Sequence, residues 1–231
     1  MSSLASPQPV INLSPDRINI LQKMSACGHL SLLMGCMFAQ KTTELIRRIR
    51  RYRSIGFNVL VINYIADNRY DSQGSSQKIV THDKESFDAI KISSLAEIDN
   101  TIRNTPYQVI VIDEGQFFPD LFKYVTAWVD SMNIHLVVGG LSADSERRPF
   151  GDMLRLIPHA DEFLQLTALC SVCRDGTLAQ FSKFLGNQVK QENQVAVGGQ
   201  NEYIPVCRRH FLSSHDQTET AHSSVFSSPP K

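Results

Sequence analysis

Two short segments of the sequence carry residues that could bind and transfer a phosphate group. The first, GCMFAQKTT at residues 35–43, comes close to the pattern G-x-x-x-x-G-K-[ST] of a phosphate-binding loop. In such a loop, backbone N–H groups surround an anion at the positive end of a helix dipole. Lys41 would reach the β and γ phosphates of a nucleotide, and the Thr42 hydroxyl would ligate Mg²⁺.

Gln40 departs from this pattern, because it stands where the second glycine belongs. A side chain there adds bulk beside the phosphate and costs strain if the local φ is positive. The segment taken alone therefore leaves open an ordinary strand–turn–helix with a chance Lys-Thr pair.

The second segment is the acidic end of the apolar run YQVIVID, where Asp113 is followed by Glu114. Ligands bind at the carboxyl ends of parallel strands in open α/β folds, so Asp113 would contact Mg²⁺ there. Glu114 could act as a base toward an attacking hydroxyl or water. An acidic pair that merely opens a loop is the alternative. The two segments together predict a nucleoside-triphosphate site.

A third set of residues has the spacing of a metal site. Cys170 and Cys173 form one C-x-x-C pair, and Cys207 and His210 form a C-x-x-H pair 33 residues further on. Three thiolates and one imidazole complete a tetrahedron around zinc and leave no position for water. We therefore expect a structural zinc ion that stabilises the segment between the two pairs.

Apolar strands that alternate with helices must position these groups. We expect strands at 29–35, 58–64, 89–95, 107–113 and 133–140, and helices at 42–54, 96–103 and 121–131. Continuous apolar strands joined by helices predict an α/β fold, in which a parallel sheet is covered by helices on both faces. The phosphate loop makes this a P-loop, recA-like sheet.

The composition and the motifs of the sequence divide the chain into four parts. Residues 1–26 are polar and proline-containing and predict a flexible arm, and residues 212–231 predict a disordered tail. Between them we expect a P-loop ATP-binding domain at 27–160 and a zinc-binding domain at 161–211.

Composition excludes several classes of protein. The 23 basic and 23 acidic residues cancel, which argues against a non-specific nucleic-acid binder. No apolar run is long enough for a membrane span, and the N-terminus lacks the features of a secretory signal. The five cysteines favour a reducing compartment. An arginine cluster at 47–53 keeps open a nucleic-acid-stimulated ATPase, although a solvated or subunit-facing helix side explains it better because the total charge is balanced.

The combined motifs resemble one family, the compact zinc-containing thymidine kinases of animals, bacteria and large DNA viruses. The resemblance spans about residues 28–212. It is carried by GCMFAQKTTELIRR, ADNRY, THD at 81–83, VIDEGQFFPD, RRPFG at 147–151, LTALCSVC and VGGQNEYIPVCRRH.

This resemblance implies an enzyme that transfers the γ-phosphate of ATP to the 5′-hydroxyl of thymidine. It implies ATP and catalytic Mg²⁺, structural Zn²⁺, and a cytoplasmic homotetramer inhibited by thymidine triphosphate, with no nucleic-acid or membrane partner. Glu114 would be the general base, and Arg69 could stabilise charge on the transferred phosphoryl group. The nucleotide-side positions would be Gly35, Cys36, Met37, Phe38, Ala39, Gln40, Lys41, Thr42, Asp67, Asn68, Arg69, Asp113 and Gln116.

The resemblance also assigns a thymidine pocket and a lasso-like loop over the base. The pocket positions are Met37, Phe117, Leu141, Ser145, Phe150, Ser182 and Tyr203, and the lasso positions are Gln194, Val195, Ala196, Val197 and Gly198. Departures from the family pattern are Gln40, Ser145, Ser182 and His210. Gln40 also leaves open a catalytically weak, ATP-binding regulatory paralogue.

Overall fold

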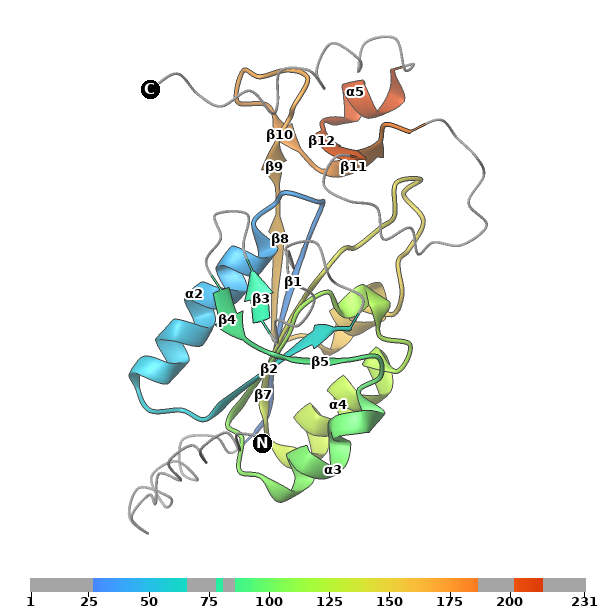
Figure 1. Cartoon of the computed structure of the whole chain (residues 1–231). Coiled ribbons are helices and arrows are strands. Elements are labelled where there is room, and N and C mark those ends of the chain that lie inside the picture. The colour runs from blue at the N-terminus through green and yellow to red at the C-terminus, as the bar shows by residue number, and fades with distance from the viewer. Residues whose placement is uncertain (1–26, 66–77, 81–85, 187–201, 214–231) are drawn as a thin grey trace, which may run out of the picture.

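The structure, a computed structural model, describes residues 27–65, 78–80, 86–186 and 202–213 (Figure 1). Its centre is a six-stranded parallel sheet with the order β5-β2-β6-β7-β1-β8. The strands are β1 (His29–Gly35), β2 (Val59–Tyr64), β5 (Ile90–Ile92), β6 (Val109–Ile112), β7 (His135–Gly140) and β8 (Glu162–Leu166). The predicted parallel sheet is confirmed.

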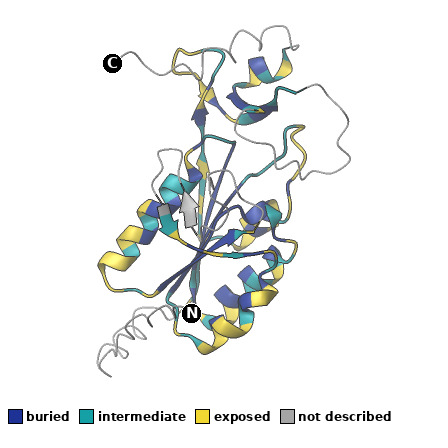
Figure 2. Cartoon of the chain, in the orientation of Figure 1, coloured by how far each residue is buried: buried dark blue, intermediate teal, exposed yellow. Residues whose placement is uncertain are grey.

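Helices cover both faces of this sheet, as the continuous apolar strands predicted (Figure 1). α2 (Lys41–Ser54) packs on one face, and α3 (Ala96–Asn104) and α4 (Leu121–Met132) pack on the other. Successive strand residues point to opposite faces, so Leu136 joins the α3–α4 core while Val137 joins the α2 core. Figure 2 shows the inner strands of the sheet buried and the outer sides of the helices exposed.

The strand order brings the two predicted chemical segments to one edge of the sheet. The phosphate loop follows β1 and the acidic pair follows β6, while β7 lies between these two strands. Because all three strands run parallel, their carboxyl ends meet at the same edge.

The sheet extends beyond residue 160, where the sequence predicted its domain to end. β8 pairs in parallel with β1, from Ser31 opposite Glu162 to Gly35 opposite Leu166. As an edge strand β8 alternates half-buried with exposed side chains, so it lacks the continuous apolar run of the inner strands. The metal-binding part therefore begins at about residue 167. A short antiparallel pair, β3 (Lys78–Val80) with β4 (Ser86–Asp88), and the 3₁₀ helix η2 (Met153–His159) were not predicted.

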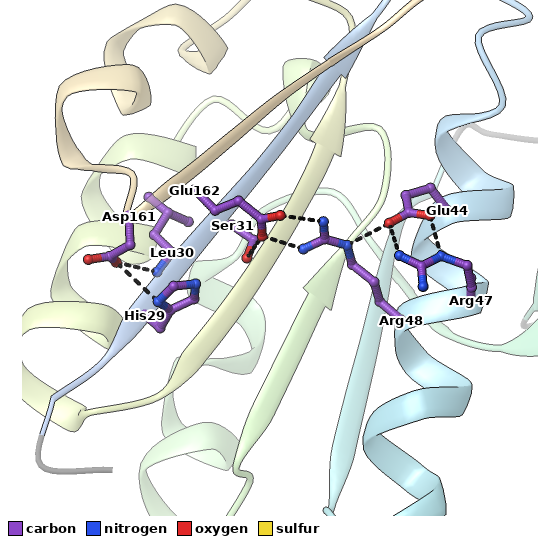
Figure 3. A network of polar contacts seen from close by, with 8 residues as sticks. All are labelled: His29, Leu30, Ser31, Glu44, Arg47, Arg48, Asp161 and Glu162. Atoms are coloured by element: carbon purple, nitrogen blue, oxygen red, sulfur yellow. Dashed lines mark hydrogen bonds and ion pairs between the residues drawn. The ribbon is translucent and has the colours of Figure 1, made fainter.

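A network of ion pairs ties α2 to the edge strand (Figure 3). Arg48 donates through both terminal nitrogens to the Glu162 carboxylate, at 2.6 and 2.7 Å, and through Nε to Glu44 at 2.8 Å. Ser31 Oγ also donates to Glu162, at 2.6 Å. These hydrogen bonds, from Arg48 first and Ser31 second, lower the pKa of Glu162 to about 2.

The same network accounts for much of the arginine cluster that kept a nucleic-acid partner open. Arg47 also pairs with Glu44, at 2.6 Å, and the Arg53 guanidinium lies 4.2 Å from the centre of the Phe87 ring. At least three of the five arginines thus contact groups of this chain.

The metal-binding part lies beyond the carboxyl ends of β1 and β8 (Figure 1). It contains two antiparallel strand pairs and a short helix: β9 (Ala168–Leu169) with β10 (Leu178–Ala179), β11 (Phe181–Phe184) with β12 (Tyr203–Val206), and α5 (Arg208–Leu212). Leu212, the first residue of the predicted tail, still belongs to α5. The arm at 1–26 and the tail from 214 lie outside the described residues. No helix in the described part of the chain is long and apolar enough to cross a membrane.

Candidate active site and metal cluster

The phosphate loop connects β1 directly to α2. Gly35 ends the strand, and α2 begins at Lys41, with Thr42 as its second residue. The Lys41 side chain is buried and its ammonium donates to the Cys36 carbonyl oxygen at 2.8 Å. The cation is therefore held across the loop at the start of the helix, where an anion would also meet the positive end of the helix dipole.

Gln40 adopts the conformation that usually requires glycine. Its φ is 59° and its ψ is 31°, in the left-handed region, and its side chain is exposed. Of the two effects expected of Gln40, the strain of a positive φ is present in the backbone. The added bulk is directed to solvent, because the side chain is exposed.

The magnesium candidates lie together. Thr42 Oγ1 donates to Asp113 Oδ2 at 2.9 Å, and Asp113 Oδ1 accepts from the backbone N–H of Glu114 at 2.9 Å. A hydroxyl and a carboxylate oxygen are hard ligands of the kind that Mg²⁺ binds. The donor set therefore suits that ion, although the pair comes from segments 71 residues apart.

Glu114 is buried at the same edge of the sheet, with 5% of its surface exposed. Its φ of 55° is again left-handed, which is uncommon for a residue with a side chain. Strained backbone conformations of this kind concentrate at functional sites. Gln116, in the 3₁₀ turn η1 (Gly115–Phe117), donates from Nε2 to Glu114 Oε2 at 2.5 Å.

Aromatic rings form a wall beside the acidic pair. Phe117 makes an edge contact with Phe150 at 5.4 Å between ring centres, and it stacks with Tyr64 at 5.2 Å. Phe118 is fully buried in the core beside this wall. Tyr64 was not among the site residues predicted from the sequence. Its position at the carboxyl end of β2, next to β6, is the signal that could have found it.

The metal-binding part contacts the phosphate loop itself. The backbone N–H of Met37 donates to Ser182 Oγ at 2.9 Å, and Cys36 Sγ donates to the Ala179 carbonyl oxygen at 3.4 Å. Met37 and Ser182, both expected in the nucleoside pocket, are thus brought together across 145 residues. Burial raises the pKa of the Cys36 thiol.

The loop after β7 contacts both the 3₁₀ turn that follows the acidic pair and the metal-binding part. Leu141 donates its backbone N–H to Gln116 Oε1 at 2.9 Å. Ser145 lies in a turn organised by Asp144, whose Oδ1 accepts from the N–H groups of the second and fourth following residues. The Arg147 guanidinium lies 4.7 Å from the centre of the Phe211 ring in α5.

The remaining predicted site residues are Tyr203, which lies in the metal-binding part, and two groups that the structure does not describe. Tyr203 packs against Phe184 at 5.1 Å in the β11–β12 pair, and burial raises the pKa of its hydroxyl. Asp67, Asn68 and Arg69, and the lasso residues Gln194 to Gly198, lie outside the described residues.

The four predicted metal ligands converge. The ligand atoms of Cys170, Cys173, Cys207 and His210 all lie within 4.8 Å of one another. Bonds of about 2.3 Å to sulfur and about 2.0–2.1 Å to nitrogen place tetrahedral ligands about 3.6–3.8 Å apart. The observed distances are 3.8 Å between two sulfurs, and 3.3, 3.4 and 3.6 Å from sulfur to His210 Nδ1.

The surroundings of the cluster also suit a metal. Burial raises the pKa of the Cys170 thiol, but backbone N–H groups, among them those of Cys173 and Cys207, outweigh burial and lower this pKa to about 6. Burial first and the hydrogen bond with Cys170 second raise the pKa of the Cys173 thiol to about 11, so without a metal Cys170 is the one of these two thiols that ionises more readily. A lowered thiol pKa favours the thiolate, which is the form that binds metal. The described residues therefore offer a closed Cys₃His set that could hold an ion.

Comparison with known proteins agrees with this arrangement. A family model described as thymidine kinase matches residues 28–211. The thymidine kinases of monkeypox virus and of vaccinia virus (strain Western Reserve) are each 38% identical to this chain over 187 residues. These matches cover 81% of this chain and 98% of each viral protein. The chain belongs to the thymidine kinase family.

Proposed function

We propose that this chain transfers the γ-phosphoryl group of ATP to the 5′-hydroxyl of thymidine, giving thymidine 5′-monophosphate. The observation that carries the proposal is the placement of the buried Glu114 beside the Thr42–Asp113 pair, in a chain of the thymidine kinase family. Phosphoryl transfer depends mainly on positioning and on neutralisation of charge, which this edge of the sheet supplies.

Each polar residue at the edge has a role in this proposal. Glu114 accepts the proton of the 5′-hydroxyl as the hydroxyl oxygen attacks the γ-phosphorus, whose bond to the β–γ bridging oxygen breaks so that ADP leaves. Lys41 binds the β and γ phosphates, and the backbone N–H groups of residues 35–42 surround them. Thr42 and Asp113 hold Mg²⁺, which when bound neutralises charge on the phosphate oxygens. Arg69 would add a further positive charge.

Apolar and backbone groups would bind the nucleoside. A flat pyrimidine needs aromatic and thioether walls with a few hydrogen bonds. Phe117, Phe150, Met37 and Leu141 supply such walls around the acidic pair. Ser145, Ser182, Tyr203 and the main chain of Gln194–Gly198 complete the pocket in this proposal, with support from the family resemblance.

The metal in the Cys₃His cluster is zinc in this proposal, and its role is structural. All four ligand positions come from the protein, so no position is left for water or substrate. The family resemblance further supports a cytoplasmic homotetramer that is inhibited by thymidine triphosphate.

A direct assay tests the function. The purified chain with ATP, Mg²⁺ and radiolabelled thymidine should form thymidine monophosphate, whereas labelled deoxycytidine serves as the control acceptor. Glu114→Gln should lower the rate by roughly 10²- to 10⁴-fold, because the proton acceptor is lost. Circular dichroism checks that this variant is folded. A folded wild-type protein that forms no product would overturn the proposal.

The same preparation distinguishes a nucleic-acid-stimulated ATPase. That activity would release phosphate without thymidine and would rise when DNA is added. We expect neither effect, since Arg47, Arg48 and Arg53 contact Glu44, Glu162 and Phe87 within the chain.

A further inference from the structure

The carboxamide of Gln116 bridges the proposed base and the loop after β7. Its Nε2 donates to Glu114 Oε2 at 2.5 Å, and its Oε1 accepts from the Leu141 backbone N–H at 2.9 Å. A carboxylate can only accept and a backbone N–H can only donate, so these two neighbours fix which end of the amide faces which. Both polar ends of Gln116 are therefore engaged by the protein.

The space around Gln116 is restricted by two glycines. A Cβ atom at Gly140 would lie 2.6 Å from Gln116 Oε1. Gly151 has a φ of +55°, and a Cβ atom there would collide with the Gln116 backbone carbonyl oxygen. Only 3% of the Gln116 surface is exposed. The side chain is thus buried against the end of β7 while its backbone is packed against Gly151, and the carboxamide cannot turn toward a bound phosphate without losing both contacts.

Glu114 needs such a support for its carboxylate. The last torsion of a glutamate side chain has only broad preferences, so the two oxygens rotate readily unless a donor holds them. A base works best when its accepting oxygen stays within hydrogen-bond reach of the substrate hydroxyl. A short bond from a buried amide to one oxygen fixes the rotation of the whole carboxylate.

We infer that Gln116 is a positioning residue for Glu114. In this inference Gln116 does not contact the nucleotide, whereas the family resemblance had implied a position on the nucleotide side. The inference rests on the proposed function. Gln116 links the base to Leu141, a proposed wall of the nucleoside pocket, so that a shift of the loop after β7 also shifts the carboxylate. Its contribution therefore acts through Glu114.

A double-mutant cycle tests this role. Gln116→Met keeps the length of the side chain and removes both hydrogen bonds. It should lower kcat by about 10- to 100-fold, because misplacement by about 1 Å can cost that much. The dissociation constant of a non-hydrolysable ATP analogue with Mg²⁺ should change by less than about twofold. In a Glu114→Gln background, Gln116→Met should produce no further loss.

The matched control is Gln108→Met. Gln108 also accepts a backbone N–H through its carboxamide, from Asn58 at 2.6 Å, but it lies at the opposite end of β6. This variant should keep its kcat. If Gln116→Met does not fold, Gln116→Asn, which keeps both polar groups on a shorter stem, carries the same cycle.

Two results would overturn the inference. One is an equal loss on adding Gln116→Met to wild type and to Glu114→Gln. The other is weaker binding of the ATP analogue by the factor lost in kcat/KM, which would make Gln116 a nucleotide contact. The cycle is measured with whichever nucleoside the wild type phosphorylates, so failure with thymidine affects only the proposed function.

Discussion

The active edge of the sheet and the Cys₃His part hold their polar groups in different ways. Asp113 and Glu114 lie on elements fixed by two large apolar cores, one on each face of the sheet. The metal-binding part has one small core, and two of its buried members, Cys36 and Ala39, come from the phosphate loop. The sheet can therefore keep its geometry without an ion, whereas we expect the smaller part, which also supports the phosphate loop, to depend on a metal held by its Cys₃His cluster.

Removal of the metal should produce the largest difference in stability between the metal-binding part and the sheet. Structural zinc contributes on the order of 10 kcal/mol to the folding of small domains. Chelation, or Cys173→Ser, should abolish the amide-exchange protection of residues 168–184 and 203–212 and leave β2, β6 and β7 protected. Thymidine phosphorylation should fall with it, because Met37 and Cys36 lose their partners Ser182 and Ala179.

Hydrogen exchange followed by mass spectrometry measures both regions in one experiment. Cys27→Ser is the control, since Cys27 is exposed and lies outside the cluster. Unchanged protection after complete removal of the metal would show that the two parts are stabilised alike.

Gln40→Gly should have a smaller effect, confined to the active edge. The left-handed conformation costs about 1–2 kcal/mol for a residue with a side chain. Glycine also gains about 0.4–1 kcal/mol of freedom in the unfolded chain, so the net stabilisation should be about 1 kcal/mol or less. Relief of strain that is present in both the ground state and the transition state does not lower the barrier, so kcat/KM should change by only a few-fold.

Asn133→Gly is the matched control for this variant. Asn133 has a φ of 55° at the end of α4, far from the active edge, so it gives the same backbone relief without a change in turnover. Urea unfolding and thymidine turnover measure the two quantities. A large gain in turnover for Gln40→Gly alone would favour the regulatory paralogue.

The smallest effect concerns the network of Figure 3, which joins α2 to the edge strand. The pKa of Glu162 is about 2, below its ordinary value of 4.5. Its stabilising contribution is therefore complete above about pH 4.5 and is lost as the pH falls toward 2. The side chain is 43% exposed, so this contribution should be about 1 kcal/mol or less.

Urea unfolding of the wild type and Glu162→Gln from pH 6 to pH 2.5 tests this pH dependence. The difference between the two proteins should shrink as the pH falls. Glu202→Gln, an exposed carboxylate outside the network, is the control. A difference that stays constant with pH would exclude the ion pair as its cause.

Much of the fold could be predicted because the inner strands are apolar on both faces. VLVINY and VIVI are read as buried parallel strands from composition alone, and they lie where they were expected. The edge strand β8 lies beyond the boundary placed near residue 160, since EFLQL alternates and lacks the continuous apolar run of the inner strands. The β3–β4 pair was missed because its strands are only three residues long.

The candidate site also contains residues that could be predicted from the sequence and contacts that could not. Cys170, Cys173, Cys207 and His210 were predicted correctly as a cluster, because two short spacings within the sequence already place the ligands in pairs. The prediction of Ser182 in the nucleoside pocket stays a prediction, and no pattern in the sequence indicated that its hydroxyl accepts from the backbone N–H of Met37. That contact depends on how β11 docks against the phosphate loop, and no local pattern records such docking.

The sequence by itself determined which residues could do chemistry and on which elements they lie, since alternation and spacing are local properties of the chain. Only the tertiary structure decided their partners. Gln116 lies 25 residues from Leu141, and Met37 lies 145 residues from Ser182. Contacts over such separations follow from the order of strands in the sheet and the docking of the metal-binding part, which are set by packing of the whole chain.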